Sequence, residues 1–109
     1  MDDSVEVVVR DAPEQERYEA WAGERLAGYL EYSRRDDDGL VLLHTEVLPE
    51  FEGHGIGALL ARTVLDEARA SGLQVDPQCP FVARWIARHQ DYLDLVPERW
   101  RGPITRAAR

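Results

Sequence analysis

The sequence contains no lysine, so its 13 basic residues are all arginines, and 21 acidic residues leave a net charge of −8. Nucleic-acid binders neutralise phosphates with surplus Lys and Arg, so this balance argues against that class. No uncharged apolar stretch approaches the roughly 20 residues that span a bilayer, and the acidic residues 1–4 are unlike a signal peptide. We therefore expect a cytoplasmic protein that binds neither nucleic acid nor membrane.

Cysteine is also scarce, because Cys79 is the only one and no internal disulfide can form. The spacing of His44, His54 and His89 matches no ligand pattern, so we predict no metal site. The length of 109 residues allows one domain. We assign residues 1–96 to that domain.

The last third of the chain differs in charge from the rest. Residues 79–109 carry six arginines and three acidic residues, a local net charge of +3. An anionic small molecule would therefore find its charged partners there. Residues 97–109 are rich in proline, glycine and arginine, and we predict a C-terminal tail that docks only through Trp100 and Ile104.

Period-2 alternation predicts four strands in the first half. They cover residues 5–10, 18–22, 26–32 and 40–47. Gly23-Glu24 is typical of a hairpin turn, and the loop 34–39 ends in the turn-forming pair Asp38-Gly39. These strands form an antiparallel meander.

The second half has helical periodicity. Apolar positions recur every three or four residues from Ile56 to Ala68, with Gly72 as the C-cap. Residues 73–76 fit a short strand, and Pro80 opens a second helix. The inner face of that helix is marked by Val82, Trp85, Ile86 and His89. We predict an α/β (α+β) fold, a mainly antiparallel sheet of about five strands with two main helices.

Three alternating glycines, Gly53, Gly55 and Gly57, lead from a strand into a helix. Such a turn leaves the first helical N–H groups free for a phosphate or pyrophosphate. A nucleotide P-loop is excluded, because no lysine follows the last glycine. The dinucleotide fingerprint Gly53-x-Gly55-x-x-Ala58, with Asp76 as a ribose-binding acid, stays an alternative that the antiparallel meander disfavours.

At this loop the chain resembles a known family. Val47-Leu48-Pro49, Gly55-x-Gly57 and the helix to Gly72 are similar to the acetyl-coenzyme-A-binding motif of the GNAT superfamily of N-acetyltransferases. The closer resemblance is to its short single-domain branch, the Yjdj-type proteins, and runs from about Val5 to Val96. That branch is marked by His44-Thr45-Glu46-Val47, Gly53-x-Gly55-Ile56, and Cys79-Pro80-Phe81-Val82 followed by Ile86, His89 and Tyr92.

The resemblance implies a site for acetyl-coenzyme A. It places the coenzyme pyrophosphate on the amides of Glu52, Gly53, His54, Gly55, Ile56, Gly57 and Ala58. It also places the pantetheine arm along the main chain of Glu46, Val47 and Leu48. Glu52 stands where the superfamily usually has arginine or glutamine. A carboxylate beside a pyrophosphate is unfavourable, so we expect Glu52 to point outward.

Three residues are candidates for acetyl-transfer chemistry. His44 and Glu46 share one strand face, and either could accept a proton from an amine. Cys79 occupies a predicted helix N-cap, where the helix dipole favours a reactive thiolate. The resemblance places this Cys-Pro pair beside the coenzyme thiol, so Cys79 could accept the acetyl group first.

The second helix supplies candidate coenzyme contacts. Arg84 and Arg88 lie four residues apart and could bind the coenzyme phosphates, and His89 could stack on the same ligand. Arginines that only solvate the helix are the competing interpretation of this pattern.

The resemblance leaves the acceptor open. GNAT enzymes usually place two helices between their first two strands, and these build much of the acceptor site, whereas here only residues 11–16 fill that interval. We predict an N-acetyltransferase acting on an unidentified amine, a small molecule or a protein, as a monomer or homodimer. The acidic surface favours a cationic amine. The alternatives are a non-catalytic coenzyme-A-binding or interaction module and a dinucleotide-binding fragment.

Overall fold

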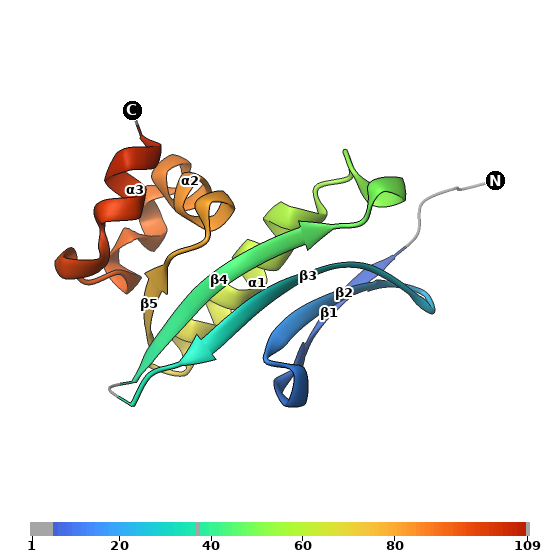
Figure 1. Cartoon of the computed structure of the whole chain (residues 1–109), viewed down its shortest axis with the longest axis horizontal. Helices are drawn as coiled ribbons and strands as arrows, with labels where there is room; N and C mark the ends of the chain where they lie inside the picture. Colours follow the sequence, from blue (N-terminus) through green and yellow to red (C-terminus); the bar gives the residue numbers. More distant parts are fainter. Residues whose placement is uncertain (1–5, 37, 109) are drawn as a thin grey trace.

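The computed structural model describes residues 6–36 and 38–108, so the predicted strand start at Val5, residues 1–4, Asp37 and Arg109 lie outside it. One five-stranded sheet runs in the order β1-β2-β3-β4-β5 (Figure 1). Its strands are β1 (Val7–Ala12), β2 (Arg17–Ala22), β3 (Arg25–Arg34), β4 (Gly39–Val47) and β5 (Gln74–Pro77). The first three pairings are antiparallel and β4 pairs with β5 in parallel. The predicted meander with a short fifth strand is confirmed.

Three helices and four short 3-10 turns complete the described chain. The helices are α1 (Ile56–Ala70), α2 (Pro80–Arg88) and α3 (Gly102–Ala107). The turns are η1 (Pro13–Gln15), η2 (Pro49–Phe51), η3 (Gln90–Leu95) and η4 (Glu98–Trp100). Only η1 lies between β1 and β2. This interval therefore contains neither of the two acceptor-site helices that GNAT enzymes usually place there.

Helix α1 lies behind the sheet in the view of Figure 1. The Tyr18 hydroxyl on β2 donates to the Glu67 carboxylate at 2.8 Å, which fixes the face of the sheet that α1 covers. Ser71 caps the helix, and Gly72 follows in the left-handed conformation at φ 71°. The Leu73 amide then donates to the Ala68 carbonyl at 2.9 Å, as in a Schellman end. Gly72 therefore ends α1 as predicted, one residue beyond the cap.

The predicted C-terminal tail needs correction. Part of residues 97–109 forms η4 and α3, and α3 packs against α2. Ile104 is buried in the core and Trp100 packs against it, as predicted, but Ala107 also packs against the core and Arg101 donates to the Val96 and Leu93 carbonyls, so these two are not the only docking residues. A helix of six residues with one buried side chain is too short to show helical periodicity, so the sequence pattern could not reveal it.

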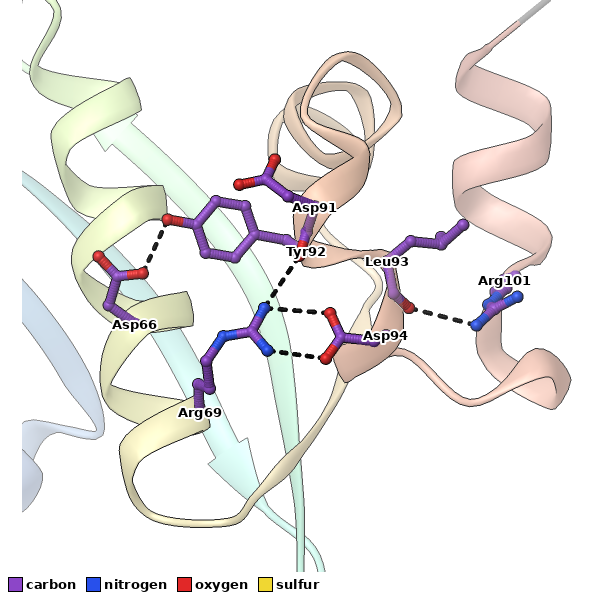
Figure 2. A network of polar contacts seen from close by, with 7 residues as sticks. All are labelled: Asp66, Arg69, Asp91, Tyr92, Leu93, Asp94 and Arg101. Carbon is purple, nitrogen blue, oxygen red and sulfur yellow. Dashed lines mark hydrogen bonds and ion pairs between the residues drawn. The ribbon is translucent and has the colours of Figure 1, made fainter.

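A polar network fastens the C-terminal segment to α1 (Figure 2). The Arg69 guanidinium donates to both carboxylate oxygens of Asp94, at 2.7 and 3.0 Å, and to the Asp91 carbonyl at 3.0 Å. The Tyr92 hydroxyl donates to the Asp66 carboxylate at 2.7 Å. From the other side, Arg101 donates to the Leu93 carbonyl at 3.3 Å. The turn η3 is therefore held between α1 and the segment that leads into α3.

The start of α1 packs directly on α2 at Gly57. A Cβ atom at residue 57 would lie 2.7 Å from the Phe81 ring, closer than real Cβ atoms approach another atom. Gly57 is buried, and the ring occupies the space that a side chain would need. The absence of a side chain at this position therefore sets the distance between α1 and α2.

Replacing Gly57 by alanine should destabilise the protein by about 1–3 kcal/mol, because the new methyl group overpacks the contact with Phe81. Helix propensity alone would give the opposite sign, a gain of about 1 kcal/mol. Denaturant unfolding measures the change. Combining Gly57→Ala with Phe81→Leu should cost less than the sum of the single changes; strict additivity would show that the ring is not the obstacle.

The ion pair of Arg69 with Asp94 predicts a pH dependence of stability. Hydrogen bonding to Arg69 holds the pKa of Asp94 below its ordinary value. The ion pair therefore stabilises the fold at a pH above the ordinary pKa of Asp94, and this stabilisation is lost as the pH falls through the lowered pKa. Asp94→Asn should therefore be less stable than wild type at about pH 7 and equal to it at about pH 2. Asp91→Asn is the matched control, because Arg69 contacts only the Asp91 carbonyl. A pH-independent difference would contradict the assignment.

Candidate functional site

Beyond Leu42, β4 has no strand partner on the β5 side within the described residues. The parallel register ends where Leu42 faces Pro77, whereas β4 continues to Val47. The Cys79 amide donates to the Leu42 carbonyl at 2.8 Å, and α2 then begins at Pro80. The last part of β4 therefore presents a free backbone edge next to the start of α2.

The peptide groups on this edge can be assigned from one hydrogen bond. The Leu48 amide donates to the Ala27 carbonyl at 2.9 Å, and the Leu48 carbonyl accepts from Phe51 at 2.9 Å. Peptide groups alternate in direction along a strand, so the N–H and C=O of Thr45 and Val47 point toward the free edge, while those of Glu46 point toward β3. Of the three predicted pantetheine contacts, only Val47 presents its main chain, and Leu48 is already engaged.

The glycine loop ends in an uncapped helix. Gly55 is the N-cap of α1 in the left-handed conformation at φ 75°, with no side-chain cap and no acidic residue in the first turn. The first helical bond joins the Leu59 amide to the Gly55 carbonyl, so the amides of residues 56–58 have no acceptor in the helix. Glu52 is exposed, as expected, and so is His54. This end of α1 favours an anion.

The three glycines have different roles, although the sequence prediction treats them alike. A Cβ atom at Gly53 or Gly55 would meet nothing within 4 Å, so both stay open to a ligand. Gly57 instead faces the Phe81 ring. Its place in the motif is explained by helix packing.

A cavity of about 360 Å³ lies between the start of α1 and α2, and we call it the α1–α2 cavity. Its lining residues are Ala58, Phe81, Arg84, Trp85, Arg88 and His89. The structure thus brings the predicted contacts Arg84, Arg88 and His89 together beside the glycine loop. Within residues 6–36 and 38–108, neither arginine forms an ion pair. The cavity is therefore basic in a chain that is acidic overall.

His89 is held in place by its own helix. Its ring stacks on Trp85 with centroids 3.8 Å apart and an interplanar angle of 12°. Its Nδ1 lies 2.8 Å from the Trp85 carbonyl, which can only accept, so Nδ1 carries the proton. A neutral His89 ring therefore keeps Nε2 as an acceptor at the cavity wall.

Cys79 lies at the junction of the free edge and α2. It is the N-cap residue of α2 but makes no side-chain cap, and its side chain is buried at 1% exposure. Its Sγ lies 3.3 Å from the Thr45 Oγ1. Sequence reasoning missed Thr45, although alternation between His44 and Glu46 places residue 45 on the opposite, inward face.

His44 and Glu46 lie together but apart from Cys79. The His44 Nε2 is 3.1 Å from the Glu46 Oε1, and both side chains are about half exposed. The register pairs them with Glu31 and Tyr29, on the sheet face away from α1. The three predicted catalytic residues are therefore divided between the two sides of β4, with His44 and Glu46 on its outer face and Cys79 beside Thr45 on its inner face.

That outer face carries a chain of cations and aromatic rings from β1 to β4. Arg10 lies 5.0 Å from the centre of the Trp21 ring, and Arg17 lies 4.5 Å from that of Tyr29. Glu19 accepts from Arg17 at 2.8 Å and from Trp21 at 3.1 Å. The Tyr29 and His44 rings meet edge-on at 6.3 Å. This chain of contacts braces the half-exposed His44.

The dinucleotide alternative does not survive. Asp76 is 1% exposed, and its two oxygens accept from Arg35 and Gln78. Because the Asp76 carboxylate is buried, a ribose hydroxyl cannot reach it, and the sheet is mainly antiparallel. Among the described residues, no three His, Cys, Asp or Glu side chains gather to hold a metal ion. No helix in the same residues has both the length and the apolar character needed to cross a bilayer.

Comparison with known proteins agrees with this geometry. Residues 17–95 match the family model described as GCN5-related N-acetyl-transferase. Among solved structures, the chain is similar to the NMR solution structure of a Staphylococcus aureus protein described as a candidate GCN5-like N-acetyltransferase, at 21% identity and a TM-score of 0.66. The alignment covers 83% of this chain and 87% of that one, and shows a common fold. No curated protein matches. Because the family model spans well over half of the sequence, the chain belongs to the GCN5-related N-acetyltransferase family, within the GNAT superfamily.

Proposed function

We propose that this protein transfers an acetyl group from acetyl-coenzyme A to the nitrogen of an amine. The observation that carries the proposal is the α1–α2 cavity, which Ala58 in the uncapped first turn of α1 lines together with Arg84 and Arg88, two arginines without an ion pair among the described residues. A negatively charged ligand would bind favourably to both the helix N-terminus and the arginines. Family membership supplies the chemistry of acetyl transfer.

In this proposal the coenzyme pyrophosphate binds at the start of α1. The free amides of residues 56–58 donate to its oxygens, and the open Gly53 and Gly55 let the ligand approach the backbone. Arg84 and Arg88 supply charge from α2. With no lysine in the chain, backbone amides and arginine are the donors available for this task.

The pantetheine arm would then follow the free edge of β4. Its two amides pair with the main chain of Thr45 and Val47, as an added strand would. This differs from the sequence prediction, which assigns the contact to Glu46, Val47 and Leu48. Travelling along β4 from Val47 toward Thr45, the arm brings its sulfur to Cys79, since the Thr45 hydroxyl lies beside that thiol.

Acetyl transfer breaks the thioester carbon–sulfur bond and forms a carbon–nitrogen bond. The amine loses a proton, and the departing thiolate gains one. We assign Cys79 to the donor side, where its sulfur can take the acetyl group and release coenzyme A before the amine attacks. We assign the His44–Glu46 pair to the acceptor side, where it can take the amine proton through water.

A coenzyme-A-binding module without turnover is the second candidate. It is favoured by the separation of Cys79 from His44 and Glu46 on two faces of β4. A thiol-release assay over a panel of amines distinguishes the acetyltransferase from the binding module, because a binding module releases no thiol. Residence in the cytoplasm and assembly as monomer or homodimer stay predictions.

Acetyl-coenzyme A should raise the melting temperature of the protein, since a ligand at about 100 times its Kd stabilises the fold by about 2.7 kcal/mol. NAD should have no effect. Arg88→Gln should weaken acetyl-coenzyme A binding about tenfold, the loss expected for a charged hydrogen bond. Arg99→Gln is the control, because Arg99 lies outside the cavity. Equal losses in both variants would leave only a nonspecific charge effect.

Incubation with acetyl-coenzyme A alone should increase the protein's mass by one acetyl group, which peptide mapping should place on Cys79. Cys79→Ser and Cys79→Ala should lose the adduct and most thiol release. Thr45→Val keeps the thiol but removes the contact at 3.3 Å, so it should slow acetylation without abolishing it. Absence of the adduct, with activity retained in Cys79→Ala, would reject covalent transfer. The amine would then attack acetyl-coenzyme A directly, with His44 and Glu46 taking its proton.

A further inference from the structure

A second cavity lies on the other side of α2, between α2 and α3, and we call it the α2–α3 cavity. Its volume is about 260 Å³. Gln78, Pro80 and Arg84 line it from the α2 side, and Pro103 and Arg106 from α3. Residues of the predicted tail therefore form one wall of this cavity.

The α2–α3 cavity is basic and has no acidic lining residue. Within the described residues, Arg84 and Arg106 form no ion pair, whereas Arg17, Arg25, Arg35 and Arg69 each bind a carboxylate. Eight of the twelve described arginines form no ion pair with a described residue, and Arg84 and Arg106 are the two of them that line this cavity together. An anion in the cavity would give both guanidinium groups a counter-charge.

The position of this cavity links it to the acetyl-transfer site. Gln78 and Pro80, which line it, are the chain neighbours of Cys79 on either side. Arg84 lines both cavities, Arg88 only the α1–α2 cavity, and Arg106 only the α2–α3 cavity. A ligand in the α2–α3 cavity would therefore lie beside the backbone of Cys79, whose buried thiol faces Thr45, without sharing Arg88.

We propose that the α2–α3 cavity binds an anionic group of the amine acceptor, a carboxylate or a phosphate, between Arg84 and Arg106. The proposal rests on the proposed acetyl transfer. Guanidinium groups bind both kinds of oxyanion through paired N–H donors. The acceptor is then an amine that also carries a negative charge, with its amine directed toward Cys79. This replaces the expectation of a purely cationic amine, which considered the acidic surface as a whole.

Two matched ligand pairs test the charge preference. The full chain, saturated with coenzyme A, is titrated with β-alanine and its neutral amide, and with phosphoethanolamine and ethanolamine. Backbone amide NMR signals of Ala83 and Ala107, which also line the cavity, report binding. At least one ligand that carries the anionic group should bind about tenfold more tightly than its partner that lacks the group. The member that does so identifies carboxylate or phosphate as the recognised group.

Variants then locate the preference. Arg106→Gln should abolish it, and Arg106→Lys should keep part of it, since charge remains without the paired donors. Arg99→Gln should keep it fully, because Arg99 lines neither cavity.

The outcomes separate this proposal from the proposed function. Coenzyme A binding without thiol release for any amine would reject turnover, and the NMR titrations would still decide whether the anion site exists. If amines with and without an anionic group gave equal thiol release, the anion site would be overturned and acetyl transfer would stand. An equal loss of coenzyme A binding in Arg106→Gln and Arg88→Gln would also overturn it, since the two cavities would then hold one ligand.

Discussion

The parting of β4 from β5 is the constraint on which the other features of the site depend. The parallel ladder stops where Leu42 faces Pro77, and proline has no N–H with which to extend it. One further bond, from the Cys79 amide to the Leu42 carbonyl, holds the chain to β4 before Pro80 begins α2. The free edge of β4, the thiol of Cys79 and the start of α2 are therefore gathered by one short proline-bounded segment.

Several contacts attach the C-terminal segment to the sheet and to α1. Phe81 fills the space beside Gly57, and Arg69 holds Asp94 from α1. Arg35 binds the buried Asp76 carboxylate, and its guanidinium also lies 4.8 Å from the centre of the Trp100 ring. One arginine thus joins the β3–β4 turn, β5 and η4. These contacts engage acidic and aromatic groups and leave Arg84, Arg88 and Arg106 without ion pairs among the described residues.

Local patterns predicted most of the fold. Alternation, the Gly23 hairpin and the Gly72 helix end depend on neighbours in sequence, and each appears as expected. The candidate contacts Arg84, Arg88 and His89 were predicted from their spacing along one helix, and the α1–α2 cavity brings them together, while their role in coenzyme binding stays a prediction. Features that arise only from tertiary contact were missed: the packing of Gly57 on Phe81 and the approach of Thr45 to Cys79. Helix α3 was missed for a different reason, because it is shorter than the window in which periodicity can be recognised.

The proposed division of β4 into a donor side and an acceptor side depends on a single extra residue. Tyr32 pairs with Leu42 and Glu31 pairs with His44, so Leu43 is a bulge without a partner on β3. In a regular ladder His44 would face Leu30, on the side covered by α1, and Thr45 would face outward. The bulge reverses this order. It turns Thr45 toward Cys79 and leaves His44 with Glu46 on the open face, so consecutive residues of one strand can serve the two partners of a transfer reaction.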